Sequence, residues 1–245
     1  MTTRLDDWFY RPQPVPHPHK RLFCFPYAGG GASFFRAWPG GLPPGIELLA
    51  LQLPGRESRF LEPPLTRISA LVKAFLPAIL PYLDVPFSFF GHSMGSTVAF
   101  ELTRHLRERS ASLPEHLFVS GHHAPQIPYP HPPIHNLPET TFLEEIRRFE
   151  GTPEEVLQHK ELMQLLIPVL RADFEMTETY QYIPGSPLTC PITVFGGRED
   201  HQVPIDNLEA WREQTMAGFA LHMFPGGHFY LQDRESQLLQ LITRI

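Results

Sequence analysis

The most informative segment of this chain is Phe87-Ser88-Phe89-Phe90-Gly91-His92-Ser93-Met94-Gly95-Ser96. A short apolar segment runs into Gly-x-Ser-x-Gly and a helical pattern follows, which is the context of a nucleophile elbow. Side chains at Gly91 and Gly95 would clash in so tight a turn, and the residue between them is held in a strained conformation with its side chain exposed. We therefore predict that Ser93 is a nucleophile beside the N-terminus of a helix, which favours negative charge. The alternative is a glycine-rich turn with a capping serine.

The composition is that of a globular protein. The chain has 245 residues, 42% hydrophobic and 19% charged, and a net charge of −6, so we expect one domain over residues 1–245. Lysine and arginine are scattered, which argues against nucleic-acid binding. No apolar run approaches about 18 residues and the N-terminus has no signal-peptide core, so we expect a cytoplasmic protein without membrane contact. Cys24 and Cys190 lie in apolar segments and are expected to be buried free thiols.

Short apolar runs alternate with helical patterns along most of the chain. Strands are predicted at 22–25, 46–53, 87–90, 117–121, 192–195 and 219–224. Helical spacing of apolar residues covers 68–83, where Pro77 and Pro81 predict a kink or a break. Continuous apolar strands that alternate with helices predict an α/β fold with a mainly parallel sheet, covered by helices on both faces.

The alternation stops between residues 122 and 180. Six prolines fall between Pro125 and Pro138, and apolar helical stretches follow them. A helical insertion placed after the strand that follows the elbow helix is predicted to be a lid over an active site. An ordinary peripheral helical subdomain is the alternative.

A serine nucleophile needs a base that is oriented by an acid, and in elbow folds the chain order is serine, acid, histidine. The strand at 192–195 is followed by Glu199 and Asp200, and the last strand is followed by His228. We predict His228 as the base, in preference to His92, His201 and His222, which lie in the elbow, directly after the acid and within a strand. Asp200 is favoured as the acid over Glu199.

The oxyanion of such an enzyme is bound by two backbone N–H groups, one from the residue after the nucleophile and one from a loop after an early strand. The first is Met94. The second is expected to be Ala28, which begins the glycine-rich run Ala28-Gly29-Gly30-Gly31. A flexible turn and a phosphate-binding loop are the alternatives, but neither phosphate-loop spacing is present.

Five motifs together resemble the type II thioesterases, the stand-alone α/β-hydrolases that accompany polyketide and nonribosomal peptide synthetases. They are Phe25-Pro26-Tyr27-Ala28-Gly29-Gly30, Leu53-Pro54-Gly55-Arg56-Glu57-Ser58-Arg59, Phe90-Gly91-His92-Ser93-Met94-Gly95, Phe195-Gly196-Gly197 leading to Asp200, and Gly226-Gly227-His228-Phe229. The resemblance implies an α/β-hydrolase fold with a helical lid and a triad of Ser93, Asp200 and His228. It implies hydrolysis of acyl groups from the phosphopantetheine arm of an acyl or peptidyl carrier protein, as an editing step.

Two other enzymes and one binding role stay open at this point. The chain could be an acyl-CoA hydrolase or a small-ester esterase, or a carrier-protein-binding module without turnover. No cofactor is required by the proposed chemistry, and we expect a monomer.

Two groups of charged or metal-ligating residue types each allow two interpretations. Arg56, Glu57 and Arg59 follow a strand end. They either meet an acidic carrier protein or its pantetheine arm, or form a local ion-pair network. His122, His123, His131 and His135 lie in a proline-rich loop that is poorly preorganised for zinc, so solvated or packed histidines are expected there and no metal site.

Overall fold

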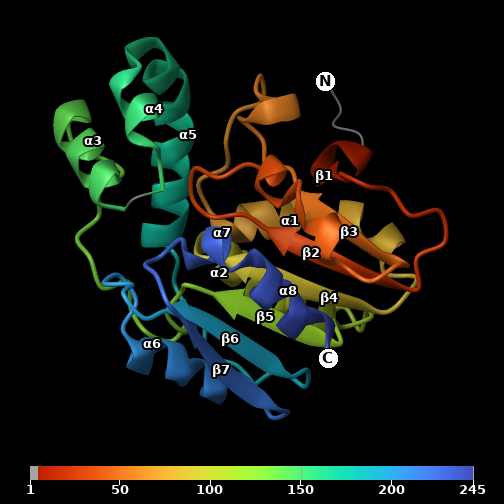
Figure 1. Cartoon of the computed structure of the whole chain (residues 1–245). Helices are drawn as coiled ribbons and strands as arrows, with labels where there is room; N and C mark the ends of the chain where they lie inside the picture. Colours follow the sequence, from red (N-terminus) through yellow and green to blue (C-terminus); the bar gives the residue numbers. More distant parts are fainter. Residues whose placement is uncertain (1–4, 150, 245) are drawn as a thin grey trace.

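A computed structural model of the chain describes residues 5–149 and 151–244 and contains a seven-stranded sheet in the order β1-β3-β2-β4-β5-β6-β7 (Figure 1). Strand β1 is antiparallel to β3, and all other neighbours are parallel. The predicted mainly parallel α/β sheet is thus confirmed. The strands are β1 (Phe9–Tyr10), β2 (Lys20–Phe25), β3 (Ile46–Leu51), β4 (Phe87–His92), β5 (His116–Ser120), β6 (Ile192–Gly197) and β7 (Phe219–Phe224).

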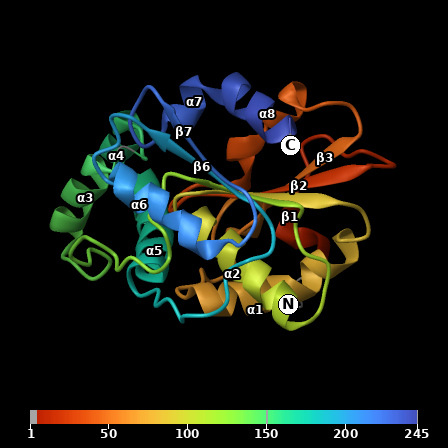
Figure 2. The same cartoon turned by 90° about the horizontal axis from the view of Figure 1, so that it is seen from below.

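Helices cover both faces of the sheet. Along β2, Phe23 and Phe25 pack in the core on the face of α1 and α2, while Leu22 and Cys24 pack on the opposite face with α8. Figure 2 shows α1, α2 and α6 on one side of the strands and α7 and α8 on the other. The helices are α1 (Ile68–Ile79), α2 (Met94–Glu108), α3 (Glu139–Arg148), α4 (Glu154–Gln158), α5 (Lys160–Glu178), α6 (Ile205–Glu209), α7 (Tyr230–Asp233) and α8 (Glu235–Thr243).

Burial on both faces explains why the strands are almost uninterrupted apolar runs. It also leaves the two cysteines, Cys24 and Cys190, buried with free thiols, as predicted. Burial raises the pKa of Cys190 to about 11, so its thiol stays protonated at neutral pH.

Helix α1 contains Pro77 and ends before Pro81. Pro77 lies inside α1, and the chain then tightens into a 3₁₀ turn, η5 (Leu80–Tyr82), that contains Pro81. A proline removes the hydrogen bond to the carbonyl four residues earlier. That carbonyl belongs to Lys73, which is exposed as Pro77 is, so water can bind it and the helix tolerates the loss.

In the sequence, helices α3, α4 and α5 come between β5 and β6. In space they stand beside one end of the sheet (Figure 1). They have an apolar core of their own, made by Ile134, Phe142, Ile146, Met163, Ile167, Leu170 and Phe174. Because β5 is parallel to its neighbours, this helical insertion leaves from the edge where those strands end. In the described parts of the chain, no helix combines the length and apolar character needed to cross a membrane.

Candidate active site

Ser93 sits in a strained turn between β4 and α2. Its backbone has φ 52° and ψ −123°, in the region that L residues rarely occupy. A Cβ on Gly91 would lie 2.2 Å from the carbonyl oxygen of Gly95, and one on Gly95 would lie 2.1 Å from the carbonyl oxygen of Phe25. Both positions therefore exclude any side chain, which is the physical content of the Gly-x-Ser-x-Gly spacing.

Hydrogen bonds to the neighbouring strand β5 and within the elbow itself fix this turn. The N–H of Ser93 donates to the carbonyl of Ser120 at 2.7 Å, and the hydroxyl of Ser96 donates to the carbonyl of Gly91 at 2.9 Å. Ser93 is partly exposed, whereas His92 and Met94 on either side of it are buried. The surrounding structure thus holds the strained backbone of Ser93 in place, and this conformation exposes the Ser93 hydroxyl.

His228 and Asp200 meet across the loops that follow β7 and β6. Gly197 pairs with Phe224 in the sheet, and a Cβ on Gly197 would lie 2.2 Å from the carbonyl oxygen of Gly227. This close contact of the loops brings His228 Nδ1 within 2.8 Å of Asp200 Oδ2. The side chains are 7% and 2% exposed. A carboxylate only accepts hydrogen bonds, so Nδ1 carries the proton and Nε2 is left as the basic nitrogen.

Asp200 and Glu199 have different partners. The second oxygen of Asp200 accepts the N–H of Gln202 at 2.9 Å, which fixes the carboxylate. Glu199 is exposed, and its carboxylate instead accepts the N–H of Gly226. Glu199 therefore joins the two loops without touching the imidazole.

None of the three other histidines considered as bases takes the place of His228, although the ring of His92 lies 5.1 Å from that of His228. His92 is fully buried, with Nδ1 2.9 Å from the hydroxyl of Ser120. His201 is exposed, and the ring of His222 stacks on Phe195 in the sheet.

The glycine-rich loop after β2 lies against the elbow. Phe25 at the end of β2 pairs with Gly91 in β4, which places the following residues beside Ser93. Gly29 has φ 82°, a value that favours glycine. Ala28 lines the same cavity as Ser93. Met94 provides the first N–H of α2, one of the four at a helix start that have no acceptor within the helix.

The cavity at this site lies between the sheet edge and the helical insertion. It holds about 710 Å³, including the part that opens to solvent, and its wall contains both Ser93 and His228. The insertion contributes Ile146, Leu170 and Phe174, which are buried apolar side chains. The cavity therefore offers an apolar surface next to a hydroxyl and an imidazole.

Neutral histidines form another part of the wall. His122 and His123 line the cavity with their rings stacked 4.2 Å apart. Burial lowers the pKa of His122 to about 4 and that of His123 to about 2. Burial, with the nearby His228 as a smaller cause, also lowers the pKa of His92 well below its usual value. These imidazoles are uncharged at neutral pH. An imidazolium at His228 would therefore lie beside neutral rings and the carboxylate of Asp200.

His135, the last of the four loop histidines, pairs through Nδ1 with the buried carboxylate of Glu178. Across residues 5–149 and 151–244, no group of three or more His, Cys, Asp or Glu side chains is arranged to hold a metal ion.

The sequence-based suggestion that Arg56 and Arg59 meet an acidic partner is wrong. Arg56 and Arg59 are 7% and 5% exposed. Arg56 is paired with Asp173, while Arg59 is paired with Glu62 and lies 3.9 Å from the centre of the Trp8 ring. Their charges are satisfied inside the fold, so they form the local ion-pair network that was the other interpretation.

Asp173 was missed by the sequence analysis. It lies in α5 between the buried Leu170 and Phe174, and its own side chain is 1% exposed. A carboxylate in the apolar stripe of a helix is a signal that the sequence does carry, because such a group must find a buried partner.

The sheet order and the exposed serine in the strained turn are those of an α/β-hydrolase. Known proteins with similar sequences agree with this fold. A family model described as a thioesterase domain matches residues 20–245. The gramicidin S biosynthesis protein GrsT of Aneurinibacillus migulanus is 46% identical over 242 residues, which are 99% of this chain and 94% of that protein. Thioesterase PikA5 of Streptomyces venezuelae is 41% identical over 96% of this chain and 84% of its own length.

A solved structure has the same fold. The type II thioesterase BorB from the borrelidin biosynthetic cluster superposes with a TM-score of 0.89 at 37% identity, over 99% of both chains. The fold and the displayed serine define a serine hydrolase of the α/β-hydrolase class. The chain belongs to the thioesterase family, and within it to the type II thioesterases.

Proposed function

We propose that Ser93, His228 and Asp200 form the catalytic triad of this thioesterase, with the N–H groups of Ala28 and Met94 as the oxyanion hole. One observation carries the proposal. The strained Ser93 and the Asp200-bound His228 line the same cavity, although they come from three loops far apart in the sequence. A serine, a base and an orienting acid at one sheet edge are the groups that acyl transfer requires.

The chemistry proceeds in two halves. Ser93 Oγ attacks the thioester carbonyl carbon while His228 Nε2 takes the hydroxyl proton, and the oxyanion accepts hydrogen bonds from Ala28 and Met94. The C–S bond then breaks, and His228 returns the proton to the leaving thiolate. A water molecule, deprotonated by His228, attacks the acyl-enzyme, and the carboxylic acid leaves as Ser93 regains its proton. Asp200 stabilises the imidazolium in both halves without becoming protonated.

We propose further that residues 122–180 are a lid within a single α/β-hydrolase domain over residues 1–245. The apolar side chains Ile146, Leu170 and Phe174 from this insertion complete the cavity around Ser93, so they would bind the acyl chain and exclude water from it.

The substrate we propose is an acyl group on the phosphopantetheine arm of a carrier protein. The names of similar proteins support this choice. GrsT is named as a gramicidin S biosynthesis protein, and BorB as a type II thioesterase from the borrelidin biosynthetic cluster. Action in the cytoplasm as a single chain is part of the same proposal. Free acyl-CoA hydrolysis is the competing function, because it needs the same triad and the same leaving thiol.

A hydrolysis panel separates these functions. The same acyl group would be offered on a carrier protein, on CoA and as a p-nitrophenyl ester, at low and high salt. We expect kcat/KM to be higher for the carrier than for CoA, and the excess to shrink with salt if charged surfaces steer the encounter. A higher kcat/KM for acyl-CoA at every ionic strength would contradict the carrier-protein proposal. Tight carrier binding without hydrolysis of any substrate would indicate a binding module instead.

A further inference from the structure

The segment Leu53-Pro54-Gly55-Arg56-Glu57-Ser58 has no role in the mechanism above, yet it packs directly under the glycine-rich loop. Arg56 Nη1 donates to the carbonyl of Gly30 at 3.0 Å. Its guanidinium also makes a two-point ion pair with Asp173 of α5, at 2.6 and 2.7 Å. Helix α5 thus reaches the loop through a charged pair that is almost fully buried.

The carboxylate of Asp173 also binds the loop itself. Its Oδ2 accepts the N–H of Gly29 at 2.7 Å. Gly29 directly follows Ala28, so both members of the ion pair hold peptide groups within two residues of the proposed oxyanion donor. Leu170, one turn earlier in α5, closes the space over Gly29, where a Cβ would lie 2.5 Å from its Cδ2.

A second carboxylate fixes the other end of the loop. Glu57, with φ 50°, accepts the N–H groups of Ala32 and Ser33, each at 3.1 Å. The pair of Asp173 and Arg56 therefore holds the start of the segment from Gly29 to Ser33, and Glu57 holds its end.

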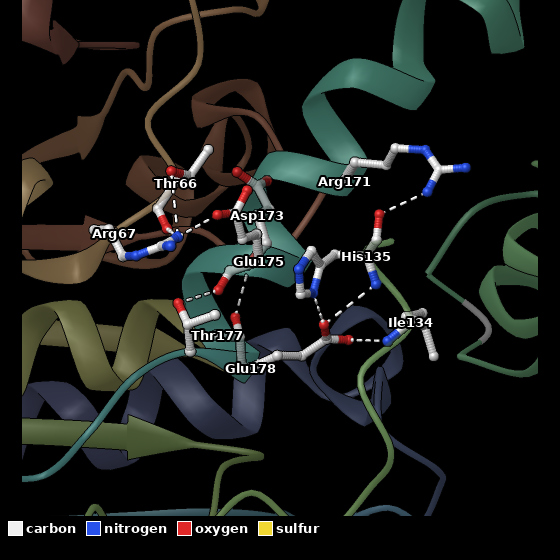
Figure 3. Close-up of polar contacts among 10 residues, drawn as sticks. Thr66, Arg67, Ile134, His135, Arg171, Asp173, Glu175, Thr177 and Glu178 are labelled. Carbon is white, nitrogen blue, oxygen red and sulfur yellow. Dashed lines mark hydrogen bonds and ion pairs between the residues drawn. The ribbon is translucent and has the colours of Figure 1, made fainter. Parts of the chain in front are cut away.

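Other contacts fix the orientation of α5, as Figure 3 shows. Glu175 pairs with Arg67 on one side of the helix. On another side, Glu178 accepts the N–H of Ile134 at 2.8 Å, and Arg171 donates to the carbonyl of His135 at 2.6 Å. The helix is tied to the chain around it on both sides, while Asp173 faces the loop.

The buried pair is a costly way to gain stability. Desolvation of two charges often cancels their attraction, and apolar replacements of similar volume can be equally stable. Among the described residues, Arg56 Nε also has no hydrogen-bond partner although it is buried. Because the Arg56–Asp173 pair adds little stability and both of its members bind the glycine-rich loop, it indicates a role in positioning that loop.

We propose that Asp173 and Arg56 are positioning residues that hold the N–H of Ala28 where the oxyanion forms. Helix α5 of the insertion is then part of the support of the oxyanion hole as well as part of the acyl cavity. This inference rests on the proposed function, because it assumes that Ala28 is an oxyanion donor.

The test replaces the pair by Arg56→Met with Asp173→Leu, which removes the hydrogen bonds to the loop without leaving one charge unpaired. The matched control is Arg147→Met with Glu154→Leu, an exposed ion pair between α3 and α4 of the same insertion that does not hold α5 against the loop. An alkylboronic acid probes the hole, since its tetrahedral serine adduct places an oxygen there. We expect kcat and boronate affinity to fall together by roughly 10- to 100-fold, somewhat less than for deletion of a donor, while KM and the control variant change less than about twofold.

Unchanged boronate affinity in a folded Arg56→Met/Asp173→Leu protein would overturn the inference. If that protein does not fold by circular dichroism, Asp173→Ser gives the same readout, because its shorter side chain no longer reaches the N–H of Gly29. Values of kcat and boronate affinity equal to wild type would again overturn the inference. Failure of the proposed function looks different: the wild-type enzyme would then form no boronate adduct on Ser93.

Discussion

At the scale of single residues, the site depends on which carboxylate reaches His228. Asp200 touches the imidazole and is buried, whereas Glu199 is exposed and binds the N–H of Gly226. We predict that Asp200→Asn lowers kcat by roughly 10⁴-fold, because an amide favours the wrong imidazole tautomer. Glu199→Gln should change kcat less than about tenfold, since it touches only the loop. Steady-state kinetics of both variants checks this, and an exchange of the two effects would move the acid to Glu199.

The glycines of the elbow give a second prediction at this scale. A Cβ on Gly95 would lie 2.1 Å from the carbonyl oxygen of Phe25, which is backbone and cannot rotate away. We expect Gly95→Ala to lower the free energy of unfolding by about 3 kcal/mol or more, at the upper end of overpacking costs. The control is Gly40→Ala, where no atom lies within 4 Å of the added Cβ. Urea unfolding measures both, and equal stability of the two variants would refute the steric account of the elbow.

At the scale of elements, the helical insertion should decide which acyl chains fit. Ile146 of α3 is buried and lines the cavity, while Leu165 of α5 is 52% exposed. We predict that Ile146→Phe lowers kcat/KM for long acyl thioesters at least about tenfold relative to short ones, because a pocket rejects groups that no longer fit by about 1–3 kcal/mol. Leu165→Phe should leave the ratio of kcat/KM between long and short acyl thioesters unchanged.

Rates for acyl chains of increasing length measure this preference. Equal losses on long and short substrates in Ile146→Phe would mean general destabilisation, and the insertion would then be a merely structural subdomain.

The elements also show what could be predicted from the sequence. The apolar strand segments, the glycine spacing and the positions of Asp200 and His228 after two strands are local patterns. The sheet, and the meeting of these two loops at one edge of it, could therefore be predicted from the sequence. Arg59 pairs with Glu62 three residues away, whereas the partner of Arg56 is distant in the sequence. Asp173 is 117 residues from Arg56 in the chain, and only the packing of α5 against the loop shows that the arginine is buried and paired.

At the scale of the whole molecule, two layers of helices bury the sheet and a third group of helices covers its carboxyl edge (Figures 1 and 2). Ala28 packs against both the sheet core and the core of the insertion. The core of the sheet thus meets the core of the insertion that lines the cavity, and the proposed oxyanion donor lies where they meet. This arrangement explains how loops distant in sequence form one site.

The most direct test of the central claim is the rate of acyl-thioester hydrolysis by Ser93→Ala, measured beside wild type and the exposed-serine control Ser69→Ala. We expect Ser93→Ala to lose activity by about 10⁴-fold or more, as removal of a triad nucleophile does, while Ser69→Ala keeps the wild-type rate. Turnover by a folded Ser93→Ala protein at the wild-type rate would contradict the serine mechanism.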